Sequence, residues 1–351
     1  MPLVGDVYQR GDFFQQIAGA HKPNIDDMLS TRGYFGLDLN LYAIYGNLKT
    51  DDGQMYEVLR NFNPDLGNKN GEKAYMGLTI QSTEVDGQNL IFDQNLIKGS
   101  ASAEGAVGVK EGNEAVWRKA DGVEGNDFEM RVSEDHYTWN EGDLFSIDGP
   151  LLGPGLHWYL PARDGGIYYV SHMFSVSGTF NGHKATGFIA FDQIYLQPGA
   201  TLYVDDPMMK NFGHLVWYTW GNTYKDGSYE AGHFIMGHDR LGFAVITDGK
   251  NVRATQDISG KVIPHSLDDS PFSAGIELTI DGQKWHFTPD PRGKMPTMLQ
   301  KYPPTPQQEG VWQREGETRE LASHWAWGET ETKYGFEPQS KLPTHRQKDK
   351  I

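Results

Sequence analysis

The stretch IYYVSHMFSVSGTFNGHKATGFIAFDQIYL, residues 167–196, decides the fold of this chain. Two runs rich in β-branched and aromatic residues flank the dipeptide Asn181-Gly182. Asn-Gly tolerates the two positive φ angles of a type I′ turn, so the stretch predicts a long antiparallel hairpin. Its second run carries one acid, Asp192, among apolar and aromatic neighbours.

The same turn signal recurs along the chain, between strand-like runs at Asp226-Gly227, Asp248-Gly249 and Asp281-Gly282. Helical signal is thin: one short helix with an Asn N-cap is expected at 24–31, and a weaker one at 11–20. The pattern predicts a meander of antiparallel hairpins. The fold class is therefore all-β, with two antiparallel barrels or strongly curved sheets and few short helices.

The length of 351 residues fits one large β domain or two domains of ordinary size. Two prolines and two adjacent acids interrupt the strand pattern at 196–213. We therefore expect an N-terminal β domain over 1–200, a C-terminal β domain over 201–340 and a polar tail over 341–351. The proline-rich stretch 289–306 predicts a long loop, with two more strands after it.

Composition excludes several classes of function. The net charge of −16 repels phosphate backbones, so nucleic acid is not an expected partner. The chain has no cysteine, which removes disulfides, thiolate nucleophiles and Cys-ligated metals. The absence of a phosphate-cradling glycine motif predicts no nucleotide or flavin cofactor. No leader or membrane-spanning segment is visible, so a soluble, cytoplasmic location is expected.

Asp192 is the first candidate for catalysis. Strand alternation places it on one face with Phe188, Ala190 and Ile194, and either face of that strand is largely apolar. Desolvation there raises the pKa of a carboxyl group toward the range useful for a general acid or base. The alternative is a structural Asp that bonds a turn or an Arg. Alternation alone leaves open which face lies inside.

Aromatic and histidine-rich runs supply the remaining candidates. Those that could orient Asp192, relay its proton or act as a second acid are His172, Tyr195, His233 and Glu230. Those that could line an apolar site are His157, Trp158, Trp217, Tyr218, Trp220, His238 and Asp239. Rings of this kind stabilise a developing carbocation, although the same residues also fill large β cores. His233 and His238 lack the same-face spacing of β-barrel metal ligands, so no metal is predicted.

The segment SGTFNGHKATGFIAFDQIYLQPG, residues 177–199, resembles the two-domain, lipocalin-like (calycin) proteins. That group includes carotenoid 1,2-hydratases, kievitone hydratases and fungal decalin-forming Diels–Alderases. The hairpin, its glycine and the acid Asp192 carry the resemblance, with Gln193 where the group usually has a His. Two further strands, HLVWYTWGNTYKDGSY from His214 and EGETRELASHWAWGETE from Glu315, extend it to roughly residues 35–335.

The resemblance implies a pocket between two barrels that holds an apolar polyene, terpenoid or polyketide. It also implies hydratase, lyase, isomerase or cyclase chemistry without an organic cofactor or metal. Two other functions stay open from the residues themselves. Asp192 and Glu230 could be the paired carboxylates of a carbohydrate-active enzyme. A lipocalin-like barrel could also carry a ligand without catalysis. The oligomeric state is not predicted.

Overall fold

The computed structural model describes most of the chain, with several gaps. The described residues are 17–30, 32–62, 77–100, 106–160, 166–200, 202, 214–237, 242–264, 270–298 and 306–330. Within them the fold is nearly all-β and contains no helix of seven or more residues, which confirms the predicted fold class. The described residues divide into two compact units, one within the ranges Ala20–His157 and Tyr168–Gly199, the other within the ranges Met1–Gly19, Trp158–Ile167 and Ala200–Ile351.

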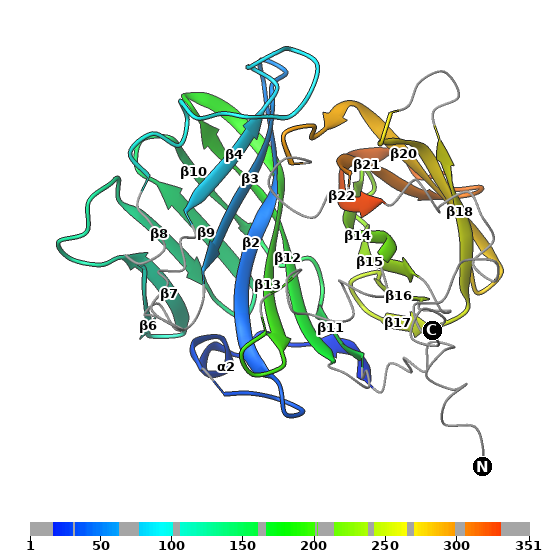
Figure 1. Ribbon diagram of the computed structural model, residues 1–351, viewed down its shortest axis with the longest axis horizontal. Coiled ribbons are helices and arrows are strands. Elements are labelled where there is room, and N and C mark those ends of the chain that lie inside the picture. Colours follow the sequence, from blue (N-terminus) through cyan, green and yellow to red (C-terminus); the bar gives the residue numbers. More distant parts are fainter. Residues whose placement is uncertain are drawn as a thin grey trace, which may run out of the picture. The chain divides into compact units, whose positions relative to one another are not determined.

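Among the described residues, thirteen strands form a strongly curled sheet that belongs mainly to the first unit (Figure 1). Its order is β5-β4-β3-β2-β13-β12-β10-β9-β8-β7-β6, and β11 joins β12 to β1. The strands are β1 (Ile17–His21), β2 (Asp38–Thr50), β3 (Met55–Phe62), β4 (Leu78–Ser82), β5 (Ile91–Phe92), β6 (Ala106–Glu111), β7 (Glu114–Lys119), β8 (Phe128–Val132), β9 (His136–Glu141), β10 (Phe145–Pro150), β11 (Gly155–Leu160), β12 (Ile167–Phe180) and β13 (His183–Leu196).

The other unit is a nearly closed barrel of nine strands, counted over its described residues. Their order is β17-β16-β15-β14-β22-β21-β20-β19-β18. The strands are β14 (His214–Tyr224), β15 (Tyr229–Gly237), β16 (Gly242–Thr247), β17 (Val252–Thr255), β18 (Ile258–Pro264), β19 (Ser273–Ile280), β20 (Gln283–Lys294), β21 (Gln307–Arg314) and β22 (Leu321–Thr330). β21 and β22 are the two late strands that the sequence predicts.

Two local expectations need correction. The weak helix expected at 11–20 is wrong over its described part, where Ile17–His21 is strand β1 and pairs with β11. A five-residue segment has little helical stability of its own, so sheet pairing determines its structure. The long loop expected at 289–306 is also wrong at its start, because β20 continues to Lys294. A shift of register after Pro289 lets the strand pass its prolines.

The one described helix, α2 (Ile25–Leu29), lies where the Asn N-cap signal places it. The side chain of Asn24 accepts hydrogen bonds from the backbone N–H groups of Asp26 and Asp27. None of the helices in the described segments has the length and apolarity needed to cross a membrane.

The long hairpin predicted from residues 167–196 forms as β12 and β13, joined by Asn181-Gly182. Both turn residues have positive φ, 48° and 84°, as a type I′ turn requires. β13 pairs on its other side with β2. The three strands are therefore the centre of the curled sheet, and nearly every residue from Gly187 to Leu196 is buried.

One face of these strands carries the aromatic core of the first unit, called here the inner face. On it Phe191 contacts the rings of Tyr42 and Trp117, at centroid distances of 6.0 and 5.2 Å. Alternation and the pairing register place His172 and Gln193 on the same inner face. The opposite face, called here the outer face, carries Asp192.

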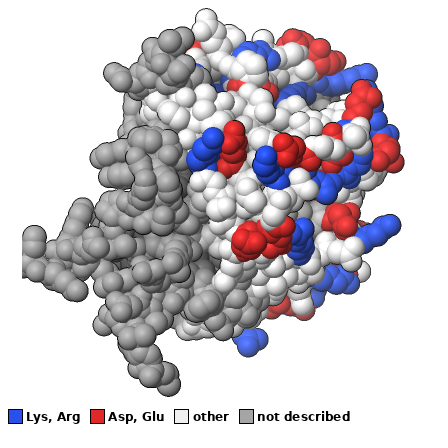
Figure 2. Space-filling model, turned by 90° about the vertical axis from the view of Figure 1, so that its right-hand side faces the viewer, with Lys and Arg blue, Asp and Glu red and all other residues white. Residues whose placement is uncertain are grey.

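The surface agrees with an acidic protein whose charges are locally balanced. Acidic and basic side chains are interspersed over the face in Figure 2. The ion pair Lys261–Glu277 joins β18 to β19, and Arg253–Asp281 joins β17 to the turn that follows β19. Exposed pairs like these contribute little to stability.

Candidate functional site

Asp192 lies at the centre of a hydroxyl-rich cluster on the outer face. Its side chain is fully buried, and Oδ2 accepts a short hydrogen bond from the hydroxyl group of Tyr169. Ser171 stands directly across from Asp192 in the β12–β13 register. Tyr45 comes from β2, and it lies on the same face as Ala43, which pairs with Asp192. Three adjacent strands thus supply one cluster around a single carboxyl group.

The environment of Asp192 brings the pKa of its carboxyl group close to neutral pH. Burial raises its pKa from 3.8 to about 7, while hydrogen bonds from Ser171, Tyr169 and Tyr45 oppose that rise. The pKa of Tyr169 is raised well above 10, first by burial and then by the nearby carboxylate. Tyr169 is therefore a hydrogen-bond donor at any ordinary pH. Asp192 is the one group of the cluster that can exchange a proton near pH 7.

Two of the residues expected to assist Asp192 lie on the other side of the sheet. His172 pairs with Phe191 and Tyr195 pairs with Tyr168, so both project from the inner face. The inner and outer faces of a strand alternate with a period of two residues. His172 therefore cannot hydrogen-bond directly to Asp192, although it is the next residue after Ser171.

His172 instead belongs to a cluster of three histidines on the inner face. Its Nε2 is 3.0 Å from Nδ1 of His21, which comes from β1. His157 of β11 lies beside His21 at a ring-centroid distance of 5.3 Å, and its Nδ1 is 3.0 Å from the hydroxyl oxygen of Tyr168. No sequence pattern indicates His21, because its segment lacks the alternation of a strand. Only the pairing of β1 with β11 brings it to the cluster.

The three imidazoles are neutral near pH 7. Burial lowers the pKa of His21 to about 4, and the pKa values of His157 and His172 are also lowered by burial. A Cβ added to Gly155 would lie only 2.2 Å from Cδ2 of His172. Glycine at this position therefore lets the imidazole of His172 lie against the backbone of β11.

In the other unit, Trp158, Trp217 and His233 lie together. The indole rings of Trp158 and Trp217 meet edge to face at 5.5 Å, and Nε1 of Trp158 is 3.5 Å from Nδ1 of His233. Burial lowers the pKa of His233 to about 3. Tyr218 and Trp220 point to the opposite side of β14, into the barrel core. Of the four aromatic residues predicted to line apolar walls, Trp158 and Trp217 thus pack on each other, whereas Tyr218 and Trp220 belong to the barrel core.

Glu230 has both carboxylate oxygens engaged. Oε1 is 3.0 Å from Arg314, and Oε2 accepts hydrogen bonds of 3.0 Å from Arg319 and Tyr224. This network ties β14, β15 and the end of β21 together. The two remaining candidates, His238 and Asp239, lie outside the described residues.

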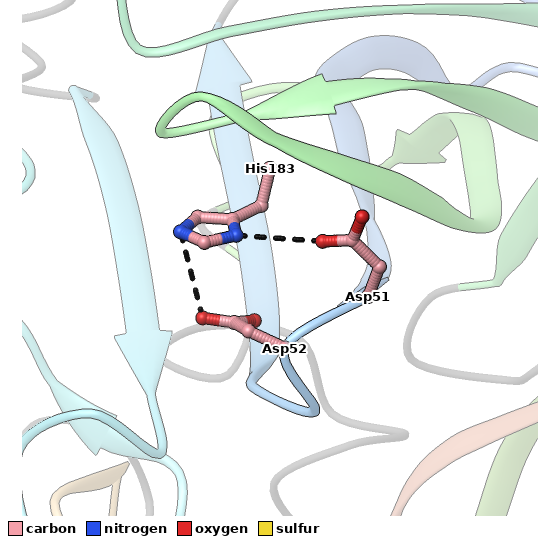
Figure 3. A group of neighbouring side chains, drawn as sticks. All are labelled: Asp51, Asp52 and His183. Carbon is pink, nitrogen blue, oxygen red and sulfur yellow. Dashed lines mark ion pairs between the residues drawn. The ribbon is translucent and has the colours of Figure 1, made fainter.

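A third group of polar side chains meets where two hairpin tips adjoin (Figure 3). His183 Nδ1 is 3.4 Å from Asp51 Oδ1, and His183 Nε2 is 3.6 Å from Asp52 Oδ2. One ligand atom from each residue lies within 4.8 Å of the others, a spacing that could hold a cation. All three side chains are exposed. The sequence missed this group because only the pairing of β2 with β13 joins the two tips.

No protein-family model and no curated protein sequence matches the chain. Solved structures with a similar fold include a protein of Nitrosomonas europaea assigned as an ATTH (16% identity, 83% of this chain, 92% of that chain, TM-score 0.49). Another is CghA, at 10% identity over 84% of this chain and 88% of that chain, with a TM-score of 0.45. A third is kievitone hydratase from Nectria haematococca, at 9% identity over 90% of this chain and 98% of that chain, with a TM-score of 0.42. Kievitone hydratases are in the group that the sequence resembles.

Proposed function

We propose that the chain is a cofactor-independent enzyme that acts on an apolar small molecule by acid and base chemistry at Asp192. The observation that supports this most is a fully buried carboxyl group, hydrogen-bonded by Tyr169, with a pKa of about 7. A group whose pKa is near the working pH both donates and accepts a proton readily. The substrate class is a terpenoid, polyene or polyketide, as the sequence resemblance implies.

The reaction class is proton-driven hydration or dehydration, isomerisation or cyclisation. In hydration, the protonated Asp192 gives its proton to an alkene carbon, and the neighbouring carbon becomes cationic. A water oxygen bonds to that carbon, and one proton of this water returns to the carboxylate. The hydroxyl groups of Tyr169, Ser171 and Tyr45 stabilise the carboxylate between the two proton transfers. Dehydration is the same sequence in reverse.

The carbohydrate alternative has less support. A glycoside hydrolase needs a second carboxyl group that is free to attack, activate water or donate a proton. Glu230, the partner that the sequence offered, is held by Arg314 and Arg319. The carrier alternative predicts that removing the acid from Asp192 leaves ligand affinity unchanged and that no product forms.

The test is turnover of a panel of apolar terpenoids, polyenes and polyketides in H₂¹⁸O, followed by mass spectrometry. Hydration adds one ¹⁸O atom, while isomerisation and cyclisation leave the mass unchanged. D192N should lose about 10²–10⁴-fold in rate and remain folded. Y137F is the matched control, because Tyr137 is a fully buried tyrosine of the same unit on β9. Equal turnover by D192N and the wild-type chain would refute the role of Asp192.

A further inference from the structure

The inner-face histidine cluster has two features that catalysis at Asp192 does not explain. The first is an unsatisfied polar atom: Nδ1 of His172 is fully buried and has no hydrogen-bond partner among the described residues. Buried polar atoms without partners are uncommon in folded proteins. His172 is therefore a buried group able to make one further hydrogen bond.

The second feature is Phe35, at the turn Tyr34–Leu37 beside the cluster. Its φ of 55° lies in the left-handed region, which bulky residues rarely adopt. Its side chain is nonetheless 49% exposed, and its ring packs edge to face on Tyr168 at 5.2 Å. Phe35 and Gly36 form a two-residue turn closed by hydrogen bonds between Tyr34 and Leu37, and this turn holds the aromatic ring near solvent rather than in the core.

Tyr168 links these two features. Its ring contacts Phe35, and its hydroxyl group is 3.0 Å from Nδ1 of His157. His157 and His21 are only partly buried, whereas His172 is fully buried behind them. An aromatic surface thus adjoins a row of neutral imidazoles. A neutral imidazole offers one hydrogen-bond donor and one acceptor, as a hydroxyl group does.

We infer that this cluster is a second binding site, separate from Asp192, for a neutral hydroxylated aromatic ring. The ring of the ligand would pack on Phe35 and Tyr168. Its hydroxyl group would exchange hydrogen bonds with the imidazoles of His21 and His157. This inference does not depend on the proposed reaction, because the cluster and Asp192 occupy opposite faces of the sheet.

The experiment is a titration of the full chain, with ¹⁵N-labelled histidine, by p-cresol and by toluene, which has the same ring but no hydroxyl group. We expect p-cresol to bind with a Kd of about 1 mM or tighter, within the range for so small a ligand. The imidazole ¹⁵N signals of His21, His157 and His172 should move during this titration. Toluene should bind at least 5-fold more weakly, since the hydrogen bond is worth about that factor.

Two substitutions locate the site. F35G should weaken p-cresol binding about 5-fold and leave the fold intact, because glycine accepts the positive φ angle. H157F should weaken it by a similar factor. D192N should bind p-cresol as the wild-type chain does. Equal affinities for p-cresol and toluene, unmoved histidine signals, unaltered binding by both F35G and H157F, or loss of binding in D192N would each overturn the inference.

Discussion

Ser171 and His172 are neighbours in β12, yet they belong to two buried clusters of opposite character. The outer cluster surrounds the carboxyl group of Asp192 with hydroxyl donors, and burial raises its pKa to about 7. The inner cluster gathers imidazoles, and burial lowers the pKa of His21 to about 4. Desolvation favours the neutral form on both faces. The comparison shows that one hairpin can hold an acid and a base on opposite faces, only one register position apart.

The largest effect should appear in the pH dependence of stability when the outer acid is removed. The folded-state pKa of Asp192 lies above its unfolded value of 3.8. The contribution of Asp192 to the free energy of unfolding is therefore complete below pH 3.8 and is lost as the pH rises through 7. D192N has no such loss. As the pH rises, the unfolding free energy of D192N should therefore increase relative to that of the wild-type chain by about 1.4 kcal/mol per pH unit. Between pH 4 and 7 the relative increase should be on the order of 4 kcal/mol.

Urea denaturation at a series of pH values measures this gain. D121N is the control, because Asp121 is an exposed carboxylate in a turn. A constant difference between D192N and the wild-type chain across this pH range would contradict the raised pKa.

The inner face should show the opposite sign. His21 has a folded-state pKa below its unfolded value of 6.5, so its contribution is full above pH 6.5 and is lost as the pH falls toward 4. In H21Q the acid-induced loss of unfolding free energy should be smaller than in the wild-type chain by about 2–3 kcal/mol. Thermal unfolding at pH 7.5 and pH 4.5 compares the two chains. Equal losses in H21Q and the wild-type chain would place His21 outside the titrating cluster.

A substitution in β11 should disturb the inner histidine cluster and leave the outer cluster around Asp192 unchanged. In G155A the new methyl group would meet both the His172 ring and the backbone oxygen of His21, at 2.2 and 2.8 Å. Overpacking of this kind costs about 1–3 kcal/mol. NMR should show shifted histidine signals and an unshifted Asp192 carboxyl signal. G275A, whose nearest contact would be 3.2 Å, is the control. A shift of Asp192 as large as that of His172 would mean that the faces are coupled.

The smallest effect concerns one hydroxyl group. Removing the Tyr169 donor in Y169F should raise the pKa of Asp192 further, by about one unit, because that hydrogen bond favours the carboxylate. A ¹³C titration of the Asp192 carboxyl carbon measures it. Y137F should leave that pKa where it is. A lowered pKa in Y169F would show that Tyr169 does not stabilise the ionised form.

The sequence alone predicted the parts that depend on local residues. Asn181-Gly182 predicted the hairpin and its turn, and the apolar neighbours of Asp192 predicted its burial and raised pKa. It could not say which face Asp192 occupies, because both faces of β13 are buried from Gly187 onward and the burial pattern carries no alternation. His21 and the pair Asp51 and His183 were missed for another reason. Their neighbours come from pairings between distant strands, which no local pattern encodes.

The Asn181-Gly182 turn also has a consequence for how the chain folds. β12 and β13 close from this turn outward, each new pair adjoining the last, so the hairpin needs no long loop closure. β2 must find β13 across much of the unit, as the pairing of Thr50 with Ala185 shows. We expect the hairpin to be structured in the folding transition state and β2 to dock after it. Ser171 and Asp192 would then be aligned early, while Tyr45 would complete the outer cluster only late in folding.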